Sequence, residues 1–269
     1  MEQIRDILKR VHPPTPSLPL NSEPALEDSM KISCPICQDA HWVYPVESGR
    51  VDYSKVVRCK CVLEKDTQER QSKLLKYCQL PTGSDNQTIE SFKDRNNPTL
   101  REAKIIAADF AIGNTGIKWL TLIGKTDLGK SHLAKGIARE WLKRGIPAKY
   151  GFVPDLLLDL KSGFEQKGEE SFESRMEAFK NIPLLVLDDL GTEKMTDWAL
   201  ETIQTIINHR YENQLNLVVT SNRPIDSILG NRTQESALAS QRIASRLQRE
   251  AWCKVLILDA PRYDGGRKC

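Results

Sequence analysis

Residues 123–135, IGKTDLGKSHLAK, combine glycines, a lysine and a serine at a spacing that can hold phosphate groups. Gly124, Gly129, Lys130 and Ser131 match the pattern G-x-x-x-x-G-K-[ST], with an apolar run before them and a helical pattern after them. In such a loop the backbone N–H groups face the phosphates, and the helix N-terminus adds positive potential. We expect Lys130 to reach the β- and γ-phosphates of ATP and the Ser131 hydroxyl to ligate Mg²⁺. The alternative is an ordinary strand-to-helix turn.

One loop residue, Asp127, has chemistry that opposes phosphate binding, because a carboxylate repels a triphosphate. Either its side chain points to solvent while its backbone N–H still serves, or the affinity for ATP is reduced. Since the loop works through backbone groups, we favour the outward orientation, and Lys125 can neutralise part of the charge. The remaining residues predicted to bind the nucleotide are Thr126, Leu128 and His132.

Two further apolar runs end in polar side chains. PLLVLDDL, residues 183–190, ends in Asp188, which we expect to hold Mg²⁺, and Asp189, which can orient or deprotonate the attacking water. Aspartate is shorter than the glutamate often found at the second position, so slow turnover is expected. NLVVTSN, residues 216–222, ends in Asn222, which would face the γ-phosphate. The alternatives are carboxylates that cap a turn, and a turn at Ser-Asn-Arg-Pro.

Four of the seven cysteines fall into two close pairs. Cys34 and Cys37 form C-P-I-C, and Cys59 and Cys61 form C-K-C after 21 intervening residues. Four thiolates suffice for a tetrahedral structural Zn²⁺, and so short a segment cannot build a stable core alone. His41 is a possible substitute for one cysteine. An iron–sulfur cluster and four unrelated buried thiols are the alternatives.

Three arginines lie at helical spacing near the C-terminus. Arg242, Arg246 and Arg249 fall at i, i+4 and i+7 of SALASQRIASRLQREA, so they share one face of a helix. They form either a solvated basic stripe or an arginine finger that reaches the nucleotide of a neighbouring subunit. Periodicity alone does not choose between these interpretations.

These residues need a sheet to bring them together, and the sequence predicts one. Short apolar runs alternate with helical patterns such as 130–145 and 197–214, as in a doubly wound parallel sheet. Ligands bind at the carboxyl ends of such strands. We therefore predict an α/β fold with a five-stranded parallel sheet flanked by helices. The predicted strands are residues 118–124, 148–153, 183–189, 216–222 and 254–259.

Length and composition set the domain organisation. The 269 residues are 39% hydrophobic and 28% charged, with a net charge of +3 that permits but does not require nucleic-acid binding. We predict an N-terminal partner-binding region over 1–80, with its zinc module at about 30–65, a linker over 81–100 and an ATPase domain over 101–269. A short N-terminal helix and a proline-rich tether at 12–24 precede the module. No apolar run reaches 18 residues and no secretory signal is evident, which favours a cytoplasmic protein with thiols or metal rather than disulfides.

The motifs GKTDLGKSHLA, LLVLDDLGTEK, VVTSN and RIASRL, in that order, resemble the AAA+ ATPases of the DnaC/DnaI helicase-loader group, which includes the IstB transposition helpers. The resemblance covers about residues 85–260 and includes TIESF at 88–92. It implies an AAA+ P-loop fold and ATP-dependent assembly on a ring helicase or on DNA. The group usually has glycine where Asp127 stands, which puts nucleotide affinity in question.

The resemblance also implies roles for individual residues. Lys130 and Ser131 belong to the phosphate loop, Asp188 and Asp189 to the acidic strand, and Asn222 to the first sensor. Arg246 aligns with the arginine finger, and Arg242 is a nearby candidate. The insert at 154–172 would grip single-stranded DNA, and an ordinary surface helix is the alternative. Its candidate contacts are Lys161, Phe164 and Lys167.

The resemblance finally implies partners. The leading hypothesis is an ATP-dependent loader that places a DnaB-type hexameric replicative helicase on single-stranded DNA and associates with itself through the ATPase domain. Similar N-terminal zinc modules occur in DnaI-type and phage-encoded loaders, and such a module would contact the helicase. The alternatives are an IstB-like transposition ATPase and a nucleotide-gated adaptor with negligible hydrolysis. No membrane partner is expected.

Overall fold

The computed structural model describes residues 32–168, 171–191, 196–227, 234–249 and 251–261. The chain divides into two compact units, the first ending at Leu63 and the second beginning at Glu64. The predicted N-terminal helix and the tether at 12–24 lie outside the described residues. No helix among the described residues is long and apolar enough to cross a lipid bilayer.

The described part of the first unit contains two short antiparallel strand pairs and a small buried cluster. β1 (Trp42–Val43) pairs with β4 (Val57–Arg58), and β2 (Val46–Glu47) pairs with β3 (Arg50–Val51). The cluster of buried residues in this unit contains Cys34, Cys37 and Cys59, with Val43 and Cys61 against it. Because the described part of this unit buries little apolar surface, a cross-link among these residues would add to its stability.

A long helix, α2 (Lys60–Cys78), starts in the first unit and ends in the second. Its last residue, Cys78, is fully buried in a core cluster of the second unit, where Leu74 also packs. The predicted linker at 81–100 follows it. Ile89 and Phe92 of that segment are buried in the same cluster, 5% exposed each.

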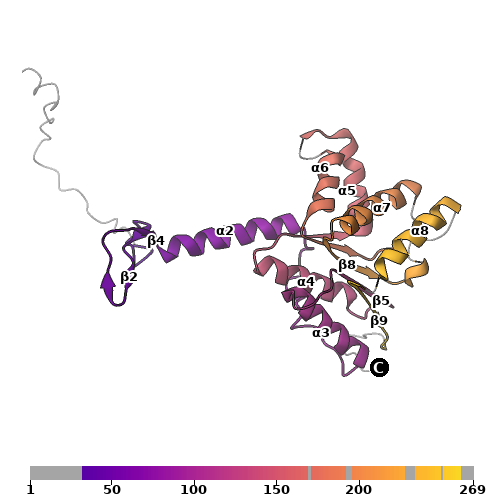
Figure 1. The fold of residues 1–269 in the computed structure, drawn as a ribbon, viewed down its shortest axis with the longest axis horizontal. Helices are drawn as coiled ribbons and strands as arrows, with labels where there is room; N and C mark the ends of the chain where they lie inside the picture. The colour runs from indigo at the N-terminus through magenta and orange to yellow at the C-terminus, as the bar shows by residue number, and fades with distance from the viewer. Residues whose placement is uncertain (1–31, 169–170, 192–195, 228–233, 250, 262–269) are drawn as a thin grey trace, which may run out of the picture. The chain divides into compact units, whose positions relative to one another are not determined.

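The second unit contains the predicted five-stranded parallel sheet (Figure 1). Its strand order is β6-β7-β8-β5-β9, and each pair is parallel. All five predicted strands are confirmed, with ends that agree within one residue. The strands are β5 (Trp119–Gly124), β6 (Ala148–Phe152), β7 (Leu184–Asp188), β8 (Asn216–Ser221) and β9 (Cys253–Leu258).

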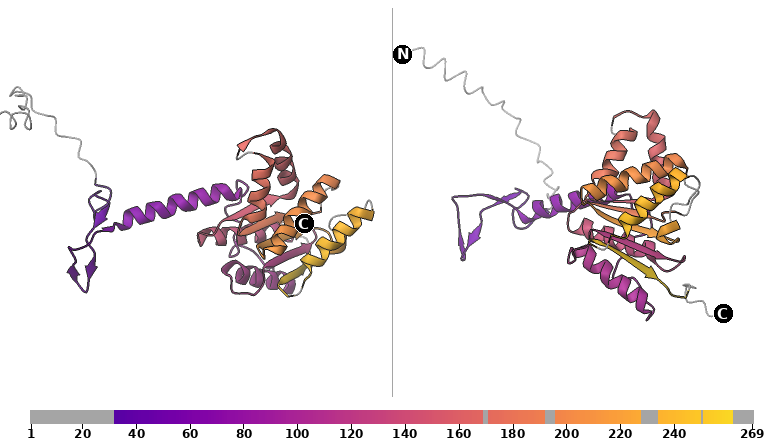
Figure 2. Two further views of the ribbon diagram at one scale, coloured as in Figure 1. Left: turned by 45° about the horizontal axis from the view of Figure 1, so that its top comes forward. Right: turned by 45° about the vertical axis from the view of Figure 1, so that its right-hand side comes forward.

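Helices cover both faces of the sheet, as a parallel sheet requires. One layer consists of α3 (Pro98–Ile112) and α4 (Lys130–Lys143). The opposite layer consists of α5 (Val153–Ser162), α6 (Phe172–Asn181), α7 (Asp197–Glu212) and α8 (Gln234–Leu247). Figure 2 shows both layers from two further directions. Two short 3-10 turns, η1 (Gly163–Glu165) and η3 (Ile225–Ser227), complete the described elements.

The two cores follow from alternation along the strands. On β5, Leu120 and Leu122 join the core beneath α3 and α4, whereas Trp119 and Ile123 join the core on the other face. Successive side chains of a strand point to opposite faces, so a continuous apolar run supplies both cores. Because β5, β7 and β8 run parallel, their carboxyl ends lie together at one end of the sheet.

Candidate functional site

The loop between β5 and α4 has the backbone conformation that its glycines permit. A Cβ at Gly124 would lie 2.5 Å from the carbonyl oxygen of Leu258, so that position has no room for a side chain. Gly129 has φ of 84° and directly precedes α4, which begins at Lys130. Asp127 also lies in the left-handed region, with φ of 63°, and its side chain is exposed. Left-handed backbone favours glycine, the residue usual at this position in the resembling group.

A cavity of about 340 Å³ lies over this loop and brings together most of the predicted site. The predicted residues that line it are Thr126, Asp127, Gly129, Lys130, Ser131, His132, Asp189 and Asn222. Gln87, Lys135 and Phe152 also line it and were not predicted. The cavity therefore joins the loop to the ends of β7 and β8, where a triphosphate would need its contacts.

Polar contacts connect three of these side chains. Lys130 Nζ donates to Asn222 Oδ1 at 2.7 Å and to the carbonyl oxygen of Lys125 at 2.7 Å. Asn222 Nδ2 in turn donates to Asp189 Oδ1 at 2.7 Å. Burial lowers the pKa of Lys130, and the nearby Asp189, Asp188 and Asp127 carboxylates partly oppose this effect. The lysine thus stays next to anionic groups in a partly desolvated site.

Asp188 is buried, 3% exposed, and both of its oxygens accept hydrogen bonds. Thr220 Oγ1 donates to Oδ1 at 2.5 Å, and the Tyr150 hydroxyl donates to Oδ2. Thr220 Oγ1 also accepts from the Asp189 backbone N–H at 2.8 Å. Burial and the Asp188 charge raise the pKa of Tyr150, so this hydroxyl remains a donor. Sequence analysis missed Tyr150, which lies on β6 inside an apolar run.

The segment before α3 packs against the phosphate loop. A Cβ at Gly129 would lie 2.5 Å from Cε2 of Phe92, and a Cβ at Gly136 would lie 2.8 Å from the backbone nitrogen of Ile89. His132 Nε2 lies 3.0 Å from Ser91 Oγ. A second cavity of about 220 Å³ lies here, lined by Ser91, Phe92, Lys93, Arg95, Asp127, Leu128, Gly129 and His132. We call residues 84–92 the strap, because they lie along α4, with Phe92 next to Gly129 and Ser84 next to Arg139.

The two predicted arginine-finger residues line neither of these cavities. Arg246 Nη1 donates to Asn208 Oδ1 at 2.5 Å, and its guanidinium lies 5.1 Å from the centre of the Tyr211 ring. Arg242 is exposed on α8. Arg246 is partly buried by these contacts, and neither arginine lines a cavity at the phosphate loop of its own chain.

The predicted DNA-binding insert is not one helix. α5 ends at Ser162, η1 follows, and α6 begins at Phe172. Lys161 and Lys167 are exposed. Phe164 is 56% exposed and stacks on Phe172, with ring centres 4.5 Å apart. These three candidates remain accessible to a ligand.

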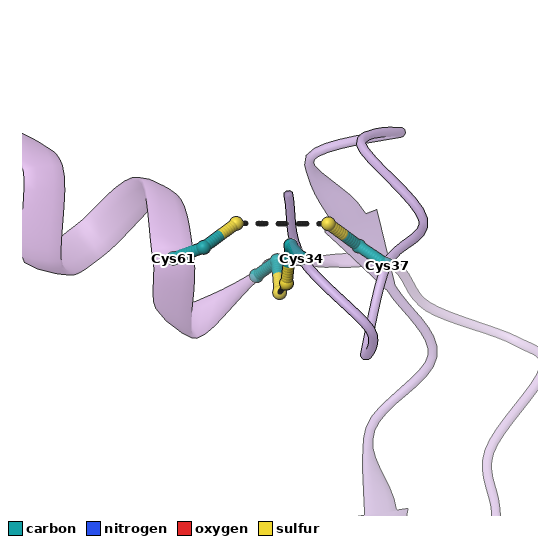
Figure 3. A group of neighbouring side chains, drawn as sticks. Cys34, Cys37 and Cys61 are labelled. Carbon is teal, nitrogen blue, oxygen red and sulfur yellow. Dashed lines mark hydrogen bonds between the residues drawn. The ribbon is translucent and has the colours of Figure 1, made fainter. Parts of the chain in front are cut away.

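The four paired cysteines converge in the first unit. Figure 3 shows three of them, Cys34, Cys37 and Cys61. Their sulfur atoms all lie within 4.8 Å of one another. Cys34 Sγ and Cys59 Sγ are 3.8 Å apart, and Cys37 Sγ and Cys61 Sγ are 3.6 Å apart. A tetrahedral Zn²⁺ with Zn–S bonds of about 2.3 Å separates its sulfurs by about 3.8 Å. The donor set therefore fits a tetrahedral thiolate-bound metal.

The local backbone explains the C-x-C spacing. Cys59 lies just before α2 and its carbonyl accepts from the Val62 N–H, so Cys61 sits in the first helical turn. Among the described residues, the group that could hold this metal ion consists of the four cysteines. The backbone carbonyl oxygen of His41 accepts a hydrogen bond from the Cys59 N–H at 2.8 Å.

The thiols cannot all ionise easily without a cation. Backbone N–H groups of Cys37 and Ile36 lower the pKa of Cys34 to about 7. Burial and contacts with the other three cysteines raise the pKa of Cys61 to about 12. A divalent cation would remove the repulsion among the thiolates.

Comparison with known proteins agrees with this geometry. Residues 47–255 match the family described as IstB-like ATP binding protein. The chain belongs to this family. It is a P-loop protein of an ATP-binding family, and it is homologous to the DnaI and DnaC helicase loaders.

Three relatives show how far this similarity extends. The replicative helicase loader DnaI of Bacillus subtilis is 28% identical over 226 residues, which are 82% of this chain and 70% of that protein. The crystal structure of the DnaC helicase loader is 26% identical, with a TM-score of 0.51, and the match covers 66% of this chain and 100% of that one. The crystal structure of DnaI supports the fold, with 22% identity and a TM-score of 0.56. That match covers 68% of this chain and 94% of the DnaI chain.

Proposed function

We propose that this protein is an ATP-dependent loader of a DnaB-type hexameric replicative helicase onto single-stranded DNA. The observation that carries the proposal is the extent of the DnaI match. Because the second unit comprises residues 64–269 of a 269-residue chain, a match over 82% of the chain must extend into the first unit. The similarity therefore includes part of the cysteine-bearing unit as well as the ATPase core. A loader acting on replicating DNA would work in the cytoplasm.

The ATP-binding role rests on the loop and on the Lys130–Asn222–Asp189 contacts. We propose that a bound triphosphate takes over Lys130 from Asn222 Oδ1 and the Lys125 carbonyl. Asp189 would then orient the attacking water, while Asn222 senses the γ-phosphate. Ser131 and Asp188 would hold Mg²⁺, which supplies positive charge to the phosphates. We expect hydrolysis to be slow without helicase or DNA.

The cysteine cluster would hold one structural Zn²⁺ that keeps the first unit folded. This unit exposes large apolar side chains, among them Trp42, Tyr44 and Tyr53, which are 54%, 48% and 74% exposed. Exposed aromatic residues are enriched where proteins bind partners. We propose that this unit contacts the helicase.

The ATPase unit would supply the remaining contacts. We propose that it self-associates, with Arg246 or Arg242 reaching the nucleotide of a neighbouring subunit. Lys161, Phe164 and Lys167 would contact single-stranded DNA through charge and base stacking.

Size-exclusion chromatography with light scattering tests the proposal. The protein is run alone and with a DnaB-type hexameric helicase from the same source, with and without ATP. We expect a stable complex that changes with ATP. Lys130→Ala should weaken ATP binding by about 10–100-fold, since a charged hydrogen bond is lost. Lys143→Ala, at the far end of α4, is the matched control and should bind ATP normally.

The outcomes separate the candidate functions. Arg246→Ala should alter the ATP-dependent complex, whereas Arg101→Ala, an exposed arginine on α3, should not. No complex in any nucleotide state would contradict the loader proposal. Filaments on duplex DNA would then favour an IstB-like transposition ATPase, the candidate that the family match also supports. A complex without turnover would favour a nucleotide-gated adaptor.

A further inference from the structure

A second cationic site surrounds Lys149 on the edge strand β6. Its side chain is only 7% exposed. The ammonium lies 4.7 Å from the centre of the Tyr77 ring and 5.1 Å from the centre of the Phe179 ring. Within the described part of the chain, it has no hydrogen-bond acceptor and no carboxylate within 4.0 Å. The ammonium of Lys149 is thus in contact with two aromatic ring faces rather than with an anion.

A buried ammonium without a carboxylate is an unfavourable arrangement. Burial lowers the pKa of Lys149, while Asp159 and Cys78 act in the opposite direction and Arg175 adds to the lowering. The aromatic rings offset part of the lost hydration, but they do not replace an anion. An apolar side chain would fill the same space without this cost. The position of the lysine therefore points to a ligand.

Lys149 lines a cavity that has room for one. The cavity measures about 640 Å³ and lies among the end of α2, β6, α5 and α6. It is lined by Lys76, Tyr77, Gln79, Lys149, Asp159, Ser174, Arg175, Ala178 and Phe179. Three of these residues are cationic. The acid among them, Asp159, pairs with Arg175 at 2.5 Å, so the lining carries three cations against one carboxylate.

We propose that this cavity binds a phosphate-bearing anion, with Lys149 Nζ as its central contact. Several cations around one cavity suit a group with more than one negative charge better than a single carboxylate. The cavity shares no lining residue with the one over the phosphate loop. The proposed site therefore uses other residues than the cavity over the phosphate loop, and its test does not depend on the loader function. A free phosphate compound and the backbone of a DNA strand offer the same chemistry.

Calorimetric titration of the full-length protein tests the proposal. Lys130→Ala is the parent variant, because it weakens phosphate binding at the loop. We expect this parent to bind pyrophosphate, and we expect added Lys149→Met to weaken binding by at least about 10-fold. Added Lys149→Arg should retain binding, and added Lys143→Met, at an exposed lysine, should leave it unchanged. A second titration with a thymidine oligonucleotide separates the two sources, since only a DNA site makes oligonucleotide and pyrophosphate compete.

A second variant guards against a folding defect. Ser174 lines the cavity three residues after the helix-capping Ser171, where glutamate favours helix formation. Ser174→Glu keeps Lys149 but places a carboxylate in the cavity, so it should also weaken pyrophosphate binding. Equal affinity in the parent and in its Lys149→Met form, or no binding of either probe to the parent, would overturn the proposal.

Discussion

Replacing Gly129 by alanine would show whether the strap holds the phosphate loop in place. Two separate effects oppose a side chain there. The backbone φ is 84°, and a Cβ would lie 2.5 Å from Cε2 of Phe92, which is buried. Gly145 provides a matched control, because its φ is 73° but a Cβ there meets nothing within 4 Å.

The control isolates the backbone effect. Left-handed backbone costs an alanine about 1–2 kcal/mol. The reduced freedom of the unfolded chain offsets about 0.4–1 kcal/mol of this. Gly145→Ala should therefore lower the free energy of unfolding by about 0.5–1 kcal/mol. Gly129→Ala adds overpacking against the Phe92 ring, about 1–3 kcal/mol, and should be the more destabilising by that amount.

Urea unfolding of the second unit, followed by circular dichroism, measures both losses in the free energy of unfolding. A Phe92→Leu background makes room for the new methyl group. In that background Gly129→Ala should cost no more than Gly145→Ala, because the steric contact is gone. Binding of a fluorescent ATP analogue should fall in parallel, since the loop must shift. Equal losses for Gly129→Ala and Gly145→Ala in the unmodified chain would refute the packing of the strap on the loop.

Three further predictions concern the site and the cysteine cluster. Asp127 lines the cavity even though the sequence favours an outward side chain. Asp127→Gly removes this carboxylate and a left-handed aspartate, so ATP should bind about 5-fold more tightly in a fluorescence titration; unchanged affinity would support the outward orientation. Tyr150→Phe removes a donor from Asp188 and should lower the free energy of unfolding by about 2 kcal/mol in urea. The raised pKa keeps the Tyr150 hydroxyl protonated in the folded protein, whereas this hydroxyl ionises in the unfolded chain above pH 10. The free energy of unfolding of the unmodified protein should therefore fall more steeply above pH 10 than that of the variant; parallel curves of this free energy against pH would contradict the prediction. Chelation or Cys59→Ser should unfold the first unit, and elemental analysis should show the loss of about one zinc per chain. The urea transition of the second unit should not change. A first unit that stays folded without metal would argue against the zinc site.

Local spacing explains what could be predicted. Each strand of the sheet is a short apolar run with a clear end, so the fold class and the carboxyl-end position of the site follow from pattern alone. The phosphate loop and the cysteine pairs are also local, because each places several ligands within a few residues. The cluster of Cys34, Cys37, Cys59 and Cys61 could therefore be predicted from their spacing.

The missed residues depend on contacts between distant segments. Tyr150 contributes to the site because β6 lies next to β7, an order that no local pattern encodes. The strap lacks periodicity, and its burial depends on small residues such as Gly136 on α4. Arg210 likewise belongs to a helix pattern, yet it is fully buried and donates to the carbonyl oxygens of Phe179 and Lys180. Such roles emerge only from tertiary packing.

The contacts of Arg246 within the chain bear on the self-association proposed above. In the isolated subunit the guanidinium is already engaged by Asn208 and by the Tyr211 ring. Any neighbouring nucleotide that recruits this arginine must break both contacts first. In an isolated chain, Arg246 would therefore keep its contacts with Asn208 and Tyr211. If Arg246 acts in trans as proposed, the phosphates of a neighbouring nucleotide must replace both contacts, so that a neighbour without bound nucleotide would leave the arginine on Asn208 and Tyr211.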